Sequence, residues 1–166
     1  ASAAVVVVLS PVNDPPVAQA AALTLEEDTP FEGALTATDC DGDALKYTLL
    51  GRPKHGEAVV DPATGALRFT PVRDYHGDDA LTVEVSDGKL KASLKATLRI
   101  APVNDRPVAH PLAISTSEDS LGTGAVAASD VDGENLTFKL GQPPVQGEAL
   151  VDAWTGAVTY RPAANA

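Results

Sequence analysis

The stretch GEAVVDPATGALRFTP (Gly56–Pro71) recurs as GEALVDAWTGAVTYRP (Gly147–Pro162), 91 residues further along the chain. Each copy places short runs of apolar and β-branched residues on both sides of a D-x-x-T-G turn, which predicts two paired strands. The same offset carries VNDPPVA, which starts at Val12, onto VNDRPVA, which starts at Val103. Similarity at a fixed period indicates a tandem array of like units.

The period divides the sequence into one complete unit and parts of two others. We expect residues 12–102 to form a complete repeat and residues 103–166 to form a repeat that lacks its last two strands. Residues 1–11 are expected to be the last strand of a preceding repeat. Their start, ASAAVVVVLS, is apolar like a signal peptide but has no basic segment before it and no cleavage site after it. Both ends of the sequence are therefore interpreted as cuts and not as natural termini.

The complete unit carries strand signals and no helical periodicity. Alternation of polar and apolar residues is clearest in LTVEVS and LKASLKATLRI. Seven short strands separated by Asp–Gly turns in about 90 residues predict an all-β fold, an immunoglobulin-like Greek-key sandwich repeated in tandem. The predicted strands are Val17–Leu25, Gly33–Thr38, Leu45–Leu50, Glu57–Asp61, Ala66–Thr70, Ala80–Ser86 and Leu90–Ile100.

Composition restricts the classes of partner. The chain has 12 basic and 23 acidic residues and a net charge of −11, which disfavours nucleic acid and anionic membrane surfaces and favours a cation. One cysteine and three histidines exclude a disulfide framework and argue against zinc. No segment approaches the roughly 20 apolar residues of a membrane span. No catalytic Ser/His/Asp or Cys/His grouping recurs and no phosphate-binding glycine loop is present, so we expect no enzyme.

Acidic residues cluster in one turn of each repeat. TDCDGD (Thr38–Asp43) is matched by SDVDGE (Ser129–Glu134), with acids at alternate positions. Close carboxylates repel one another unless they are solvated or bridged by a cation, and calcium accepts six to eight oxygen ligands. Asp and Gly also favour turns for conformational reasons alone. An EF-hand is excluded because Ala44 and Leu50 stand where that loop needs Gly and Glu.

An ordered set of motifs resembles the cadherin-like repeats of large bacterial surface and secreted proteins. The motifs are PVNDxPVA, LEEDTP, ATDCDGDALKYTL, VDPATGALRFTP, DYHGDDALTVEVSDG and the closing strand. The resemblance covers nearly the whole complete unit. It implies a calcium-binding cell-adhesion or spacer array on the bacterial surface or secreted from the cell, with calcium at the junctions between repeats. Its implied partners are calcium, neighbouring repeats of the same chain, and homophilic contacts or cell-surface polysaccharide, without direct membrane insertion.

The resemblance also implies particular calcium ligands. The linker departs from the animal pattern DxNDN, because proline replaces its first acid and Pro15 or Arg106 replaces its last Asn. Fewer than three ions are therefore expected at each junction. At the junction that precedes the complete unit, the ligands would be Asn13, Asp14, Asp39, Asp41 and Asp87. At the junction that follows the complete unit, the ligands would be Glu27, either Asp74 or Asp79, Asn104, Asp105, Asp130 and Asp132.

Two other interpretations remain open. A carbohydrate-binding module is an alternative, because similar repeats occur beside polysaccharide-degrading domains. Such a module needs exposed aromatic residues, and the chain has one Trp, three Tyr and three Phe. Trp154, which replaces Ala63 in the D-x-x-T-G turn, could stack on a sugar ring or simply pack at the tip of the hairpin. The third interpretation is self-association, in which the strand predicted in residues 1–10 pairs with a sheet edge of another chain.

Overall fold

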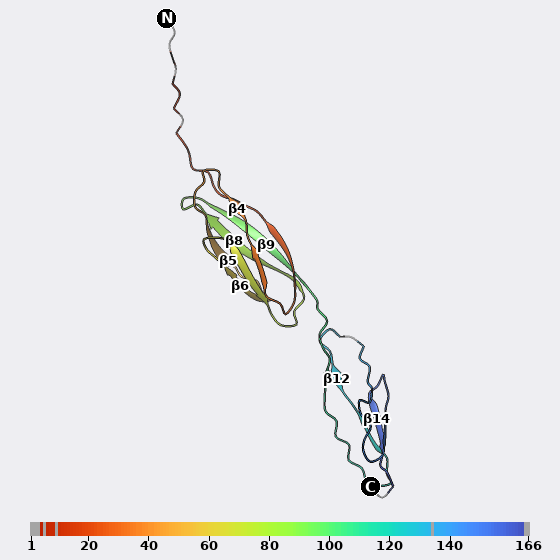
Figure 1. Cartoon of the computed structure of the whole chain (residues 1–166). Helices are drawn as coiled ribbons and strands as arrows, with labels where there is room; N and C mark the ends of the chain where they lie inside the picture. The colour runs from red at the N-terminus through yellow and green to blue at the C-terminus, as the bar shows by residue number, and fades with distance from the viewer. Residues whose placement is uncertain (1–3, 5, 9, 134, 165–166) are drawn as a thin grey trace. The chain divides into compact units, whose positions relative to one another are not determined.

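The computed structural model describes residues 4, 6–8, 10–133 and 135–164, and the regular structure in this part of the chain consists of strands (Figure 1). The all-β prediction is therefore confirmed. The chain divides into two compact units, Ala1–Val103 and Asn104–Ala166, called unit 1 and unit 2 below. Among the described residues, no helix has the length and apolar character needed to cross a membrane.

The larger sheet of unit 1 has four strands in the order β2-β9-β8-β5. Its strand pairs are antiparallel except that of β2 with β9, which is parallel. The period-two alternation of the sequence appears as burial, since every second residue from Leu94 to Ile100 is at most 2% exposed. These strands are β2 (Ala21–Glu26), β9 (Lys91–Ala101), β8 (Gly77–Ser86) and β5 (Lys46–Gly51).

The second sheet of unit 1 has the order β3-β7-β6, formed by Phe31–Ala34, Ala66–Pro71 and Gly56–Val60. Buried side chains of both sheets form one core cluster, with the ring of Phe69 at 0% exposure. Gly56 is needed beside this ring, because a Cβ at that position would lie 2.5 Å from it. Two sheets that share a core in this way form the predicted sandwich.

The first predicted strand is divided between two pairings. β1 (Val17–Ala18) pairs antiparallel with β4 (Ala37–Thr38), whereas β2 runs parallel to β9. The predicted strand Gly33–Thr38 is likewise split between β3 and β4. Alternation in the sequence shows which face a residue takes, but it does not show where a strand changes partner.

Unit 2 repeats the smaller sheet of unit 1. Its strands pair in the orders β11-β14-β13 and β10-β12, which matches unit 1 at an offset of 91 residues. The counterparts of β2 and β5, residues 112–117 and 137–142, carry no strand. In unit 1 these strands pair with β9 and β8, whose counterparts would lie beyond residue 166. The strands are β10 (Val108–Ala109), β11 (Gly122–Ala125), β12 (Ala128–Ser129), β13 (Glu148–Val151) and β14 (Ala157–Arg161).

The strand predicted in residues 1–10 stays a prediction. Residues 4, 6–8 and 10 carry no strand, and the other five lie outside the described residues. Val6, Val7 and Val8 are 82%, 75% and 83% exposed. A strand at this position would need a neighbouring strand with which to pair.

Candidate metal centre

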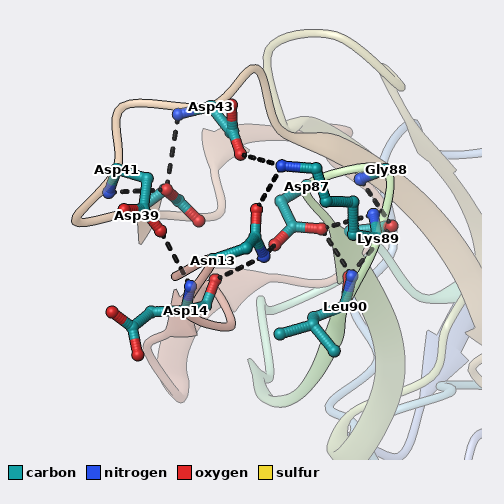
Figure 2. Close-up of polar contacts among 10 residues, drawn as sticks. Asn13, Asp14, Asp39, Asp41, Asp43, Asp87, Gly88, Lys89 and Leu90 are labelled. Atoms are coloured by element: carbon teal, nitrogen blue, oxygen red, sulfur yellow. Dashed lines mark hydrogen bonds and ion pairs between the residues drawn. The ribbon is translucent and has the colours of Figure 1, made fainter. Parts of the chain in front are cut away.

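The acidic turn of unit 1 is organised around one carboxylate. Oδ1 of Asp39 accepts hydrogen bonds from the backbone N–H groups of Asp41 (2.9 Å) and Asp43 (3.3 Å), as Asp side chains do when they stabilise turns (Figure 2). Gly42 lies in the turn with φ +79°, a conformation that suits glycine. Oδ2 of Asp39 is buried and has no hydrogen-bond donor among the described residues. A buried carboxylate oxygen without a partner is costly unless a cation reaches it.

Two further segments meet this turn. The backbone N–H of Asp14 donates to Oδ2 of Asp41 (2.8 Å), and the side-chain amide of Asn13 donates to Oδ2 of Asp87 (2.8 Å). Asp87 lies between β8 and β9 and is 9% exposed. Residues separated by 74 positions in the sequence are thereby brought together.

The carboxylate of Asp87 is held in its charged form. Its Oδ1 accepts the backbone N–H groups of Leu90 and Lys89, each at 2.6 Å. The N–H of Leu90, the amide of Asn13 and the N–H of Lys89 lower the pKa of the Asp87 carboxyl below its ordinary value. The group is therefore an anion at neutral pH and can serve as a cation ligand.

A lysine ammonium enters the same cluster. Nζ of Lys89 donates to Oδ1 of Asn13 (2.7 Å) and lies 3.5 Å from Oδ2 of Asp43, as Figure 2 shows. The lysine side chain is 65% exposed, so it can move away into solvent. Lys89 was missed in the sequence, where its only signal is its place directly after the SDG turn. Asp43 is its ion-pair partner.

Cys40 does not offer a thiolate here. Its Sγ donates to Oδ2 of Asp14 (3.5 Å). That hydrogen bond, with burial and the charges of Asp14, Asp41 and Asp39, raises the pKa of the thiol. The ligand atoms of Cys40, Asp14 and Asp41 lie within 4.8 Å of one another. A protonated thiol leaves carboxylate and amide oxygens as the available donors, and these suit a hard cation.

Unit 2 repeats the linker and turn contacts. The N–H of Asp105 donates to Oδ2 of Asp132 (2.7 Å), and the N–H of Asp132 donates to Oδ1 of Asp130 (2.9 Å). The side-chain amide of Asn104 donates to the carbonyl of Asp105 (2.9 Å). Each bond has its counterpart in unit 1 at an offset of 91 residues. The period of the sequence is thus also a period of this polar geometry.

Acids also gather in unit 1 where β2 and β9 end. Glu27 is 2% exposed, its Oε1 accepts the N–H of Val103 (2.8 Å), and Nδ1 of His76 lies 3.7 Å from its Oε2. Oδ1 of Asp28 accepts the N–H of Asp74 (2.9 Å). Both aspartates have a positive φ, near +58°, which Asp tolerates better than most residues. Glu27 therefore lies beside the last residue of unit 1, directly before the linker sequence.

Asp79 lies elsewhere in unit 1. Its side chain is 4% exposed and accepts the backbone N–H groups of Lys54 (3.0 Å), His55 (2.6 Å) and Ala80 (2.7 Å). Burial raises the pKa of the Asp79 carboxyl, but these three donors and the charge of His55 outweigh it and lower the pKa. Asp74 and Asp79 were predicted as alternative calcium ligands. Asp74 contacts another acid, Asp28, whereas the carboxylate of Asp79 accepts hydrogen bonds from the loop before β6.

The fold and the repeated acidic turn define a class of protein, the immunoglobulin-like tandem repeat. The profile of the Bacterial Ig domain family matches residues 13–101 and again 104–166, so the chain belongs to this family. The two matches cover both units.

Solved structures show the same fold. The chain is similar to human protocadherin-24 EC1-2, with a TM-score of 0.64 and 20% identity over 92% of this chain and 80% of that one. It is also similar to protocadherin gammaB7 EC3-6, with a TM-score of 0.59 and 17% identity over 94% of this chain and 45% of that one. The sequence resemblance to cadherin-like repeats is confirmed at the level of fold.

A curated relative is human FRAS1-related extracellular matrix protein 2. It is 29% identical over 171 residues, which cover 84% of this chain and 5% of that protein. The chain thus spans a small part of the length of this relative.

Proposed function

We propose that the acidic turns and their linkers bind Ca²⁺, and that this binding stiffens a tandem array in a secreted or cell-surface protein that serves as a spacer or in adhesion. The observation that carries the proposal is the buried Oδ2 of Asp39, which lies in a cluster of oxygen donors and has no hydrogen-bond partner in the described part of the chain. The repeat of the linker and turn contacts in unit 2 supports it. The extracellular location draws support from the matrix protein named above.

The donor chemistry fits calcium better than a softer metal. Carboxylate, amide and carbonyl oxygens are the ligands of Ca²⁺, whereas zinc prefers imidazole and thiolate. The proposed ligands in unit 1 around the segment Asn13–Asp14 are Asn13, Asp14, Asp39, Asp41 and Asp87. In unit 2 we propose Asn104, Asp105, Asp130 and Asp132. In unit 1, where β2 and β9 end, we propose Glu27 and Asp74.

Calcium would act by linkage, because it binds the ordered arrangement and not the splayed one. For a Kd on the order of 10⁻⁴–10⁻³ M, millimolar calcium contributes ~0.4–1.4 kcal/mol per site. This is small beside the roughly 5–15 kcal/mol of a folded domain. It is enough to order a short linker in which carboxylates would otherwise repel one another. The proposal gives the chain a mechanical role and no catalytic one.

The test compares residues 1–166 in calcium and in EDTA by small-angle scattering, calorimetry and thermal unfolding. We expect calcium to bind, to raise the melting temperature and to increase the maximum dimension. The variant Asp41→Asn/Asp132→Asn should lose these effects. The control Glu57→Gln/Glu148→Gln removes the same charge from exposed, repeat-related positions and should keep them. Identical scattering and melting curves of the wild type in both buffers would contradict the proposal.

A further inference from the structure

An open groove of about 700 Å³ lies on the solvent-facing side of the four-stranded sheet of unit 1. Its floor is a cross-strand row of small residues, in which Thr97 of β9 pairs with Ala22 of β2 and with Ala80 of β8. Lys95 and Arg99 lie on the same face of β9, two residues to either side of Thr97, about 13 Å apart. Small residues between long cationic ones make a trough, and Asp78 is the cross-strand neighbour of Arg99 at one end of it.

The groove is a basic site on an acidic protein. Four basic and two acidic residues line it, an excess of two positive charges, whereas the whole chain carries −11. None of the four basic side chains forms an ion pair within the described residues. Their charges therefore remain available to a ligand. The four basic residues are Arg52, Lys54, Lys95 and Arg99.

Asp79 fixes the loop that carries two of these charges. Its buried carboxylate accepts the N–H groups of Lys54 and His55 at 3.0 and 2.6 Å, so its own charge is directed at the backbone. The ring of His55 stacks on Tyr75 with centroids 3.8 Å apart and planes at 6°. The loop is thus held on two sides, and the cost of ordering it on binding is reduced.

The charges of this loop are not part of the repeated framework. Pro53 and Gly56 recur as Pro144 and Gly147, 91 residues later. Between them, however, lysine and histidine are replaced by valine and glutamine, and Arg52 is replaced by proline. The fold of the repeat therefore does not require the positive charges, and they are a property of unit 1.

We propose that this groove binds an acidic polysaccharide through carboxylate or sulfate groups spaced along its chain. The basic side chains would hold the anionic groups, and Thr24 and Thr97 offer hydroxyls to the sugar. A nucleic acid fits less well, because the residues that line the groove include no Phe, Tyr or Trp on which bases could stack. This site is separate from the calcium proposal and does not depend on it.

The test uses residues 1–166 in EDTA, so that calcium plays no part in the result. Polygalacturonate supplies carboxylates and dextran sulfate supplies sulfates, with neutral dextran and single-stranded DNA as comparisons. Binding is measured by affinity electrophoresis and biolayer interferometry at low and high salt. We expect binding to one or both acidic polysaccharides, weakened by salt, and none to dextran. The polymer that binds more tightly identifies the anionic group.

Charge-matched variants locate the site. Lys95→Gln/Arg99→Gln and Arg52→Gln/Lys54→Gln should each weaken binding about tenfold per removed charge. The control Arg68→Gln/Lys91→Gln removes two exposed charges outside the groove and should bind as the wild type does. All four positions of the groove variants are exposed, and thermal unfolding verifies that the variants fold. Absence of binding, equal loss in the control variant, or equally tight binding of single-stranded DNA would overturn the proposal.

Discussion

Replacement of Lys89 by alanine should tighten calcium binding in unit 1. The lysine ammonium lies 3.5 Å from a carboxylate oxygen of Asp43 and donates to Asn13, so it occupies space among the proposed ligands. Calcium must displace this ammonium before it can bind there. Because Lys89 is tethered to the chain, it competes with calcium at a constant effective concentration.

The size of the effect follows from that distance. Two unit charges 3.5 Å apart in water attract with ~1.2 kcal/mol, and physiological salt reduces this to ~0.8 kcal/mol. Because the lysine side chain is 65% exposed, the dielectric constant of water is appropriate. Removal of the competitor should therefore lower the calcium Kd of unit 1 by about fourfold to sevenfold.

The assay is a calcium titration that is monitored by calorimetry and by NMR. The NMR signals are the amide resonances of Gly42 and Gly88, which lie in the two turns of the cluster. Lys91→Ala is the matched control, since Lys91 has similar exposure but pairs with Glu84 at 2.8 Å on the sheet face. Both variants change the net charge equally, which isolates the local effect. A calcium Kd for Lys89→Ala that equals or exceeds that of Lys91→Ala would refute the competition.

Three further outcomes are expected. Phe69→Ala, at a fully buried position, should cost ~3–5 kcal/mol of unfolding free energy, measured by denaturant titration. Gly65→Ala should lower the free energy of unfolding more than Gly42→Ala does, in the same denaturant titration. Both glycines have a positive φ. A Cβ on Gly65 would lie 2.7 Å from the carbonyl oxygen of Leu35, whereas the space around Gly42 is open. The lowered pKa of Asp79 means that its carboxylate stabilises the fold above its unfolded pKa of about 3.9 and loses this effect as the pH falls through the folded value. The melting-temperature advantage of the wild type over Asp79→Asn should therefore shrink below about pH 4; an advantage that is constant from pH 7 to pH 3 would contradict this.

Much of the fold was predictable because it depends on local pattern. The alternation in β8 and β9 predicts which residues face the core, and the D-x-x-T-G turn predicts the hairpin of β6 and β7. The acids of the turns were also found from their spacing and their recurrence. The division of the first strand between β1 and β2 was not found, because the partner of a strand is a long-range property.

The sequence by itself determined the period of 91 residues, the strand pattern and the acidic character of the turns, since each is a property of residues close in the chain. Tertiary structure alone decided which distant groups meet. It placed Lys89 among the acids and left an oxygen of Asp39 buried with no hydrogen-bond partner among the residues described. It also placed the carboxylate of Asp79 where it accepts the backbone N–H of Lys54. It also gathered four cations from β9 and the loop after β5 into one groove. Side-chain contacts of this kind depend on strand order and register, which no local pattern specifies.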